Sequence, residues 1–124
     1  DHITLNVVDM KATIAFYKKL GMQREGRLDN DDVVFLWNGD EERPLHVQLD
    51  QVHGDMKPGL NHIAFTMADL EEAVKGMEKV GIEGLHDPFY VPRSGRTIFT
   101  FRGPDGVTLQ LARKDGRGEY EEHP

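Results

Sequence analysis

The pattern of apolar and polar positions occurs twice along this chain. Positions 1–22, DHITLNVVDMKATIAFYKKLGM, align without a gap on positions 61–82, NHIAFTMADLEEAVKGMEKVGI. In each copy apolar and polar residues first alternate, which predicts a strand, and apolar residues then recur every three or four positions, which predicts a helix. The chain is therefore expected to contain two copies of one structural unit. The aligned identities are His2/His62, Ile3/Ile63, Asp9/Asp69, Lys19/Lys79 and Gly21/Gly81.

The ends of both helices are marked by residues of the expected type. Asp9 and Asp69 occupy the N-cap position, where a short polar side chain accepts a hydrogen bond from the first turn. Gly21 and Gly81 follow the last apolar residue, where a left-handed residue ends a helix. The sequence therefore predicts helices over 10–20 and 70–80.

Three further strands are predicted after each helix, separated by turns rich in Asp, Asn, Gly and Pro. The chain is accordingly expected to be α+β, with the order βαβββ twice and eight strands. One domain would cover 1–113, with modules at about 1–52 and 60–113 joined by the linker 53–59, followed by a flexible acidic tail at 114–124. The predicted strands are 22–28, 33–37, 45–50, 82–86, 96–102 and 108–113.

Strand alternation assigns side chains to faces. Apolar side chains of each predicted sheet would pack on the helix, and the opposite, polar faces would line a cavity. His2 and His62 lie on these polar faces at matching positions of the repeat. Gln48 in LHVQLD and Gln110 in VTLQLA also match, each followed by leucine.

Composition excludes several classes of protein. The net charge of −7 argues against a general nucleic-acid binder, which needs clustered Lys and Arg. Absence of cysteine excludes disulfides, thiolate metal ligands and a cysteine nucleophile. No apolar run approaches the ~20 residues of a membrane span, and no signal peptide is visible, so a cytoplasmic location is expected.

The two copies, together with GRTIFTFRGPDGVTLQL at 95–111, resemble the vicinal oxygen chelate superfamily, which includes glyoxalase I, extradiol dioxygenases and bleomycin-binding resistance proteins. The last segment is similar to the turn and final strand of that family, usually DPDG and then Glu-Leu. The resemblance implies that the two modules form a cupped, incomplete eight-stranded barrel. It also implies a small-molecule substrate or ligand and a homodimer.

A divalent metal site is implied by the same resemblance. The family takes metal ligands from the first and last strand of each module, which here are His2, Gln48, His62 and Gln110, for Zn, Ni, Mn or Fe. Most catalytic members have glutamate in at least one of these positions, and this chain has none. An amide oxygen carries no charge and takes no proton at neutral pH, so glyoxalase-type base catalysis and a two-His-one-carboxylate dioxygenase centre are both put in doubt. The glutamines could also be hydrogen-bonding groups for a bound ligand, or remnants of a lost metal site.

Other polar and aromatic residues are candidates for contacts with a substrate. Asp50 shares the face of Gln48 and could act as a base, although solvation at a strand end is the simpler interpretation. His46, on that face too, could join the site or replace Gln48. For the remaining candidates a place in the core or on a solvated loop is the alternative. The expected substrate contacts are Trp37, His46, Tyr90, Arg93 and Arg96.

Two functions follow from these observations. The first is a metal-dependent enzyme of lyase, isomerase or transferase type, resembling glyoxalase I. The second is a metal-free protein that sequesters a ligand, like the bleomycin-binding members. The histidine pair favours the first function, and the missing carboxylates favour the second.

Overall fold

The computed structural model describes residues 1–25 and 32–118 and divides them into two compact units. We call residues 2–61 the first module, and Asp1 with residues 62–118 the second module. The elements follow the order βαβββ twice, so the predicted α+β class and repeat are confirmed. The end of the predicted strand 22–28 and most of the predicted tail lie outside the described residues.

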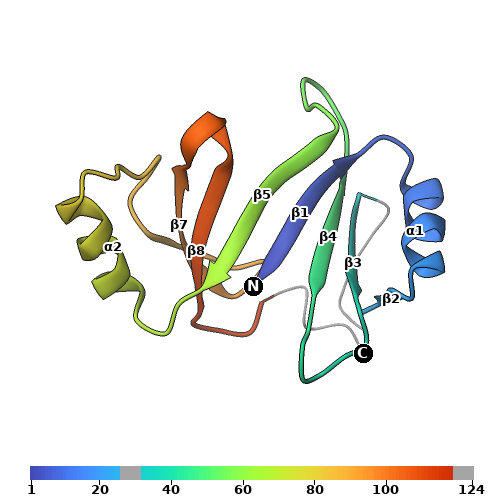
Figure 1. Cartoon of the computed structure of the whole chain (residues 1–124), viewed down its shortest axis with the longest axis horizontal. Helices are drawn as coiled ribbons and strands as arrows, with labels where there is room; N and C mark the ends of the chain where they lie inside the picture. Colours follow the sequence, from blue (N-terminus) through green and yellow to red (C-terminus); the bar gives the residue numbers. More distant parts are fainter. Residues whose placement is uncertain (26–31, 119–124) are drawn as a thin grey trace. The chain divides into compact units, whose positions relative to one another are not determined.

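The first module has strand order β2-β3-β4-β1 (Figure 1). Its first and last strands are parallel neighbours, with Thr4 level with Gln48, whereas β3 pairs with β4 in the antiparallel sense. The elements are β1 (His2–Val7), α1 (Met10–Lys19), β2 (Gln23–Arg24), β3 (Val33–Trp37) and β4 (His46–Gln51).

The second module repeats this arrangement with order β5-β8-β7-β6. Here β5 and β8 are the parallel neighbours, with Ala64 level with Gln110, and β7 pairs with β8 in the antiparallel sense. The elements are β5 (Gly59–Thr66), α2 (Leu70–Lys79), β6 (Phe89–Val91), β7 (Arg96–Arg102), a short 3₁₀ turn (Pro104–Gly106) and β8 (Thr108–Lys114), and the first three residues of β5 belong to the first module.

Both helices begin at the predicted residues, Met10 and Leu70, and end one residue before the predicted ends, at Lys19 and Lys79. The Asp9 carboxylate accepts from the Ala12 amide at 3.0 Å, and the Asp69 carboxylate accepts from the Glu72 amide at 3.0 Å. Gly21 and Gly81 follow the helices with φ of 92° and 83°, a region that a glycine adopts at no steric cost.

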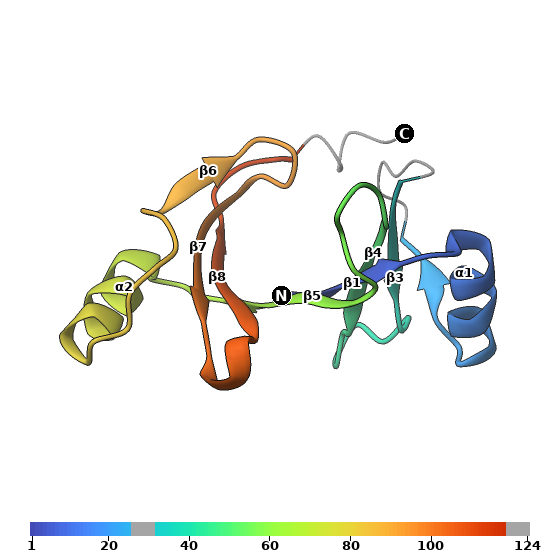
Figure 2. The ribbon, with the colours of Figure 1, turned by 90° about the horizontal axis from the view of Figure 1, so that it is seen from above.

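Each helix covers one face of its own sheet (Figures 1 and 2). The apolar cluster of the first module joins α1 to the strand residues Val34, Leu36, Val47 and Leu49. The cluster of the second module joins Leu70 and Val74 of α2 to Phe99 and Leu111. Because alternate side chains of a strand point to opposite faces, these contacts also decide which side chains point away from the helices.

The predicted strand 82–86 is wrong. The structure has only an isolated bridge from Gly84 to Phe101 there, and the regular strand begins at Phe89. In the first module the matching residue Met22 is 9% exposed and joins the core, whereas Ile82 is 37% exposed. Gly84 lies directly against the Phe99 ring, where any Cβ would overlap it, and glycine weakens a strand.

The C-terminal segment is regular for longer than the sequence indicated. Strand β8 continues through Lys114, and the amides of Asp115 and Gly116 donate to the Gly95 carbonyl at 2.9 and 3.0 Å.

A charged cluster also holds this end of β8 to α2. Arg113 binds the Glu71 carboxylate with two nitrogens and donates to Asp115 from Nε at 2.8 Å.

Gly95 should be intolerant of any side chain. It has φ of 71°, and a Cβ would overlap the backbone of Gly116 and Gly118. We expect Gly95→Ala to lower the free energy of unfolding by about 3 kcal/mol or more, because left-handed strain and overlap with backbone act together. Chemical denaturation measures this loss. Gly21→Ala is the matched control, since Gly21 has φ of 92° and open space around its Cβ, and should cost only about 1 kcal/mol. Equal losses would contradict the packing argument.

Arg113 should contribute stability that depends on pH. Its hydrogen bonds lower the pKa of the Glu71 and Asp115 carboxyls below their ordinary values. Because the folded pKa values are depressed, the contribution is present above the unfolded pKa values of about 4 and is lost as pH falls through the lower, folded values. Thermal melts should show Arg113→Gln less stable than the parent at pH 7, with the two converging at pH 2. An unchanged gap at pH 2 would mean that the arginine stabilises by packing.

Candidate functional site

The polar face of the first module carries Gln48 at its centre. Its neighbours Val47 and Leu49 are buried against α1, so Gln48 points to the opposite face. In register it lies between Thr4 of β1 and Phe35 of β3, which are 0% and 3% exposed. The predicted facing of Gln48 is therefore confirmed.

A hydrogen bond fixes the orientation of the Gln48 amide. Its Nε2 donates to Oδ1 of Asp50 at 2.8 Å, two residues further along the same face. A carboxylate accepts and the amide nitrogen only donates, so this bond directs the nitrogen to Asp50 and turns the amide oxygen another way. Asp50, predicted as a base, here orients Gln48.

His46 and Trp37 form the adjacent row of the same face. They are paired in register, and their rings stack at 6.1 Å with 13° between planes. Nδ1 of His46 lies 2.6 Å from Oε1 of Glu25, whose side chain is only 12% exposed. The carboxylate accepts, so Nδ1 of His46 carries a proton. Continuing the register of β1 and β4 places His2 level with His46.

Glu25 was missed by the sequence analysis. Its amide donates to the Phe35 carbonyl at 2.9 Å, which extends the ladder of β2 by one residue. Met22 is in the core, and alternation from it puts Glu25 on the polar face. That alternation was visible in the sequence, but the pairing with His46 depends on strand register.

The second module presents the matching arrangement. Gln110 lies in register between Ala64 of β5 and Thr100 of β7. Leu111, the next residue, packs with α2, so Gln110 points to the other face. His62 precedes Ala64 by two residues and shares its face, just as His2 precedes Thr4 in the first module.

Each module therefore provides one histidine and one glutamine as diagonal neighbours on parallel strands. A step of two residues along a strand and one strand across separates such Cα atoms by about 8 Å. Imidazole and amide side chains on one face can bridge that distance to a shared ligand. Both are donors to Zn, Ni, Fe or Mn, with imidazole the stronger.

No carboxylate completes these pairs. Within residues 1–25 and 32–118 there is no group of three or more His, Asp or Glu side chains arranged to hold a metal ion. A metal centre built from the predicted ligands would therefore depend on the two amide oxygens. Such a set is uncharged, which weakens binding of a divalent cation.

The residues predicted to contact substrate in the second module lie next to other protein groups or in an exposed turn. Arg96 donates from Nε to the Asp1 carboxylate at 2.8 Å and from Nη1 to the Ser94 carbonyl at 3.1 Å, with its side chain 15% exposed. An anionic substrate would have to displace Asp1 to bind it. Arg93 is exposed in the turn after β6, and the hydroxyl of Tyr90 lies against Gly116.

Two cavities lie away from the predicted site residues. The first module has one of about 710 Å³ between the start of α1 and the sheet, where Met10 and Val34 form apolar walls. The second module has one of about 550 Å³ between the end of α2 and Phe99. Neither is lined by any of the predicted ligands or substrate contacts, and both are on the helix-covered side of their sheet. No helix in the described part of the chain is long and apolar enough to cross a membrane.

Solved structures with the same fold are numerous. A hypothetical protein, BH1468, from Bacillus halodurans C-125 superposes with a TM-score of 0.72 at 21% identity, covering 96% of both chains. A variant of methylmalonyl-CoA epimerase from Streptomyces coelicolor, in complex with 2-nitronate-propionyl-CoA, gives 0.70 at 24% identity over 92% of both chains. Methylmalonyl-CoA epimerase from Mycobacterium tuberculosis gives 0.69 at 19% identity, covering 91% of this chain and 85% of that one. These identities establish a shared fold and nothing more.

Comparison with curated proteins gives no match. The family model described as the Glyoxalase/Bleomycin resistance protein/Dioxygenase superfamily matches residues 1–111, which include both modules almost entirely. This match is consistent with the repeat and with the parallel first and last strands of each module. The chain therefore belongs to the Glyoxalase/Bleomycin resistance protein/Dioxygenase superfamily.

Proposed function

We propose that this protein is a metal-dependent enzyme of isomerase type that acts on an oxygen-bearing small molecule. The ligands would be His2 and Gln48 of the first module with His62 and Gln110 of the second. The observation that carries the proposal is the bond from Gln48 Nε2 to Asp50, because it leaves the amide oxygen as the group that Gln48 offers to a cation. The same His-Gln placement in the second module supports it.

The residues present fit a weakly held divalent ion. Two imidazoles and two amide oxygens are acceptable donors for Zn, Ni, Mn or Fe, although they supply no negative charge. Bound there, the ion would polarise a substrate oxygen as a Lewis acid. Asp50 has the role of a positioning residue in this scheme, since it holds the Gln48 amide in one orientation.

The methylmalonyl-CoA epimerases among the similar structures favour isomerisation over the other reaction types that the sequence left open. Isomerisation by proton transfer needs an acid or base, and glutamine cannot serve as one. Asp50 as that base, a homodimeric state and a cytoplasmic location all stay predictions from the sequence.

A second function, sequestration of a ligand without metal, is favoured by one observation. Trp37 and His46 stack to form an aromatic surface on the polar face of the first module. Such a surface suits a planar or aromatic ligand, and it needs no metal. The two functions differ in whether the His-Gln pairs take up an ion.

Metal uptake tests the enzyme proposal. We expect protein purified without a tag or chelator to contain about one transition-metal ion per chain by elemental analysis. His62→Ala should abolish Zn²⁺ or Co²⁺ binding in calorimetric titration, because it removes one of the two stronger donors. Gln110→Glu should strengthen binding on the order of tenfold, about 1.4 kcal/mol, by adding a charge.

The matched control is His53→Ala, since His53 is an exposed histidine in the segment between β4 and β5. It should leave the metal content unchanged. Failure of the parent protein to take up Zn²⁺, Ni²⁺ or Mn²⁺ would overturn the proposed metal site. Equal affinity of Gln110→Glu and the parent would exclude Gln110 as a ligand.

Fluorescence of Trp37 tests the sequestration alternative, since it is the chain's one tryptophan. In metal-stripped protein, an aromatic ligand bound at the Trp37–His46 surface should quench or shift the emission with a saturable dependence on concentration. The effect should weaken in His46→Ala, which removes the stacked ring. A flat response across a varied panel of aromatic ligands would count against sequestration at this surface.

A further inference from the structure

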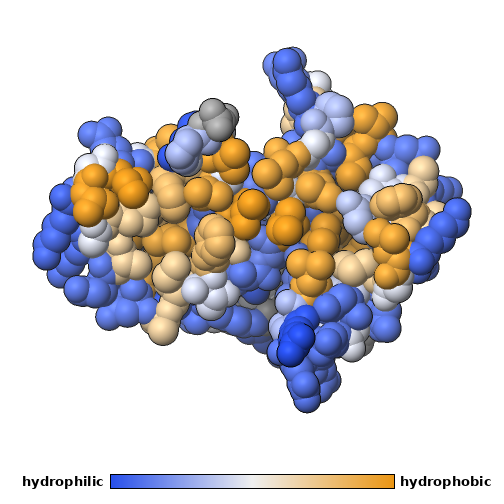
Figure 3. Space-filling view, viewed as in Figure 1, coloured by the Kyte–Doolittle hydropathy of each residue, from blue (hydrophilic) through white to orange (hydrophobic). Residues whose placement is uncertain are grey.

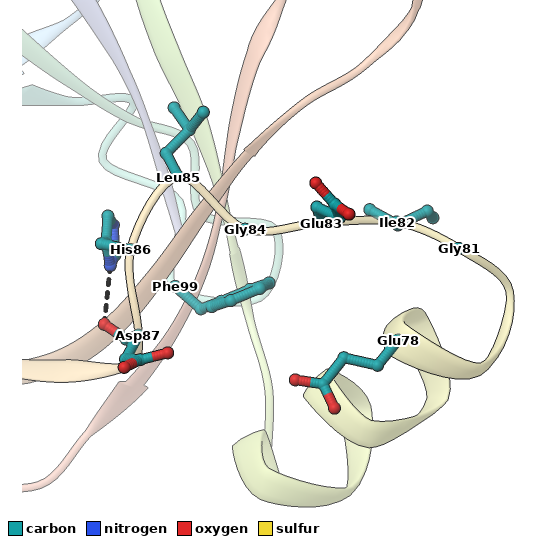
Figure 4. A pocket seen from close by; sticks show the side chains of 9 residues that line it. All are labelled: Glu78, Gly81, Ile82, Glu83, Gly84, Leu85, His86, Asp87 and Phe99. Atoms are coloured by element: carbon teal, nitrogen blue, oxygen red, sulfur yellow. Dashed lines mark hydrogen bonds between the residues drawn. The ribbon is translucent and has the colours of Figure 1, made fainter.

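The proposed function does not involve the cavity of the second module. It lies between the end of α2 at Glu78, the segment 81–87 and the ring of Phe99 (Figure 4), and has a volume of about 550 Å³. That volume is within the range of sites that hold small organic molecules.

The segment that lines the cavity pairs with the sheet over a shorter stretch than its counterpart in the first module. In the first module, the residues that follow the helix enter the core through Met22 and pair with β3 at Gln23 and Arg24. In the second module, the equivalent segment has a single bridge from Gly84 to Phe101 and a hydrogen bond from the Leu85 amide to the Thr100 carbonyl at 2.8 Å. The cavity lies beside this segment and the end of α2.

Aromatic rings form one wall of this cavity. Phe99 is 3% exposed and contacts His86 edge to face, with ring centroids 6.2 Å apart. His86 in turn contacts Phe89 at 4.8 Å. The backbone of Gly84 lies directly against the Phe99 ring, where a Cβ would overlap it, so the segment 81–87 approaches the ring closely at this point.

Exposed apolar side chains also line the cavity. Ile82 and Leu85 are 37% and 53% exposed. Apolar residues reach the surface close to α2 in the space-filling view (Figure 3). Together with Phe99, they provide a surface for the hydrocarbon part of a ligand.

The carboxylate side chains that line the cavity favour a positive charge. Three carboxylates, those of Glu78, Glu83 and Asp87, line it, and neither lysine nor arginine does. None of the three forms an ion pair with another residue in the described part of the chain. In Figure 4 the carboxylates of Glu78 and Asp87 point toward each other from opposite sides of the cavity.

A backbone contact fixes the His86 ring. Its Nδ1 lies 2.8 Å from the Asp87 carbonyl oxygen, which can only accept, so Nδ1 carries a proton. An ammonium group can donate to the three carboxylates that line the cavity.

This cavity is separate from the His62–Gln110 pair. Phe99 and Leu111 are partners in register and pack with α2, whereas Gln110 points to the other face of the same sheet. A ligand in the cavity would not contact the proposed metal ligands of the second module.

We propose that this cavity binds a small organic cation, a primary or quaternary amine with an aromatic or branched aliphatic body. The body packs on the exposed apolar rim beside Phe99, and the ammonium lies between the carboxylates. Three carboxylates without a cationic neighbour attract a cation at long range. The carboxylates therefore select the charge, and the apolar rim selects an organic ligand over a hydrated metal ion.

A set of isosteric probes tests the charge selection. The probes are 2-phenylethylamine, 2-phenylethanol and 3-phenylpropionate, titrated into uniformly ¹⁵N-labelled full-length protein and followed by amide chemical shifts. We expect the amine to shift the amides of Gly84, Leu85 and His86 and to bind at least about fivefold more tightly than the alcohol. The anion should cause no saturable shift. Raising the salt from 20 mM to 500 mM should weaken the amine alone.

Two pairs of variants test the location. Glu78→Gln with Asp87→Asn should weaken the amine about fivefold to tenfold, whereas Glu41→Gln with Glu42→Gln, which neutralises two exposed carboxylates of the first module, should not. Ile82→Lys places a positive charge at the rim and should also weaken binding. Val80→Lys is its control, because Val80 is 73% exposed and does not line the cavity.

Three results would overturn the proposal. They are equal binding of amine and alcohol, shifts that map away from residues 78–87, and equal losses in the cavity variants and their controls. Circular dichroism of each variant confirms that it is folded. Metal uptake by His2 and His62 is measured in a separate experiment. Failure of amine binding would leave the proposed metal-dependent function intact, and failure of metal uptake would leave the amine site intact.

Discussion

Parallel pairing between the first and last strand of each module is the constraint on which the rest of the structure depends. It places β1 beside β4 and β5 beside β8, segments more than forty residues apart in sequence. A parallel pair needs a crossover, and here the helix and the two intervening strands provide it. Once this pairing and the helix-facing core are fixed, alternation leaves a histidine and a glutamine together on the remaining face of each module.

The two faces of each sheet have different chemical roles. The helix-covered face is closed by aliphatic and aromatic side chains around residues such as Leu36, Leu49 and Leu70. The other face carries imidazole, amide and carboxylate groups, of which Gln48 and Asp50 already orient one another. Burial of the first face holds the strands in register, and register in turn sets the spacing of the polar groups on the second.

Departure from the repeat is as informative as the repeat itself. The first module uses the segment after its helix to form the edge strand β2, whereas the equivalent segment of the second module makes a single bridge to β7 and lies beside a cavity lined by carboxylates and rings. Family membership describes what the modules share, and such differences distinguish one member from another. Glu25 is a second such difference. It contacts His46 in the first module, and the described residues of the second module contain no equivalent pair.

Much of the fold was determined by the sequence alone, because periodicity, caps and turns are local. Alternation and helical spacing predicted both helices and most strands, and Asp9, Asp69, Gly21 and Gly81 marked the ends where the structure has them. The same alternation also predicted that Gln48 points to the face of the sheet opposite the helix. Tertiary structure alone decided the rest, because it joins residues distant in the chain. It formed the Arg96–Asp1 and Glu25–His46 pairs, and it reduced the predicted strand 82–86 to a single bridge at Gly84, where the backbone lies against Phe99.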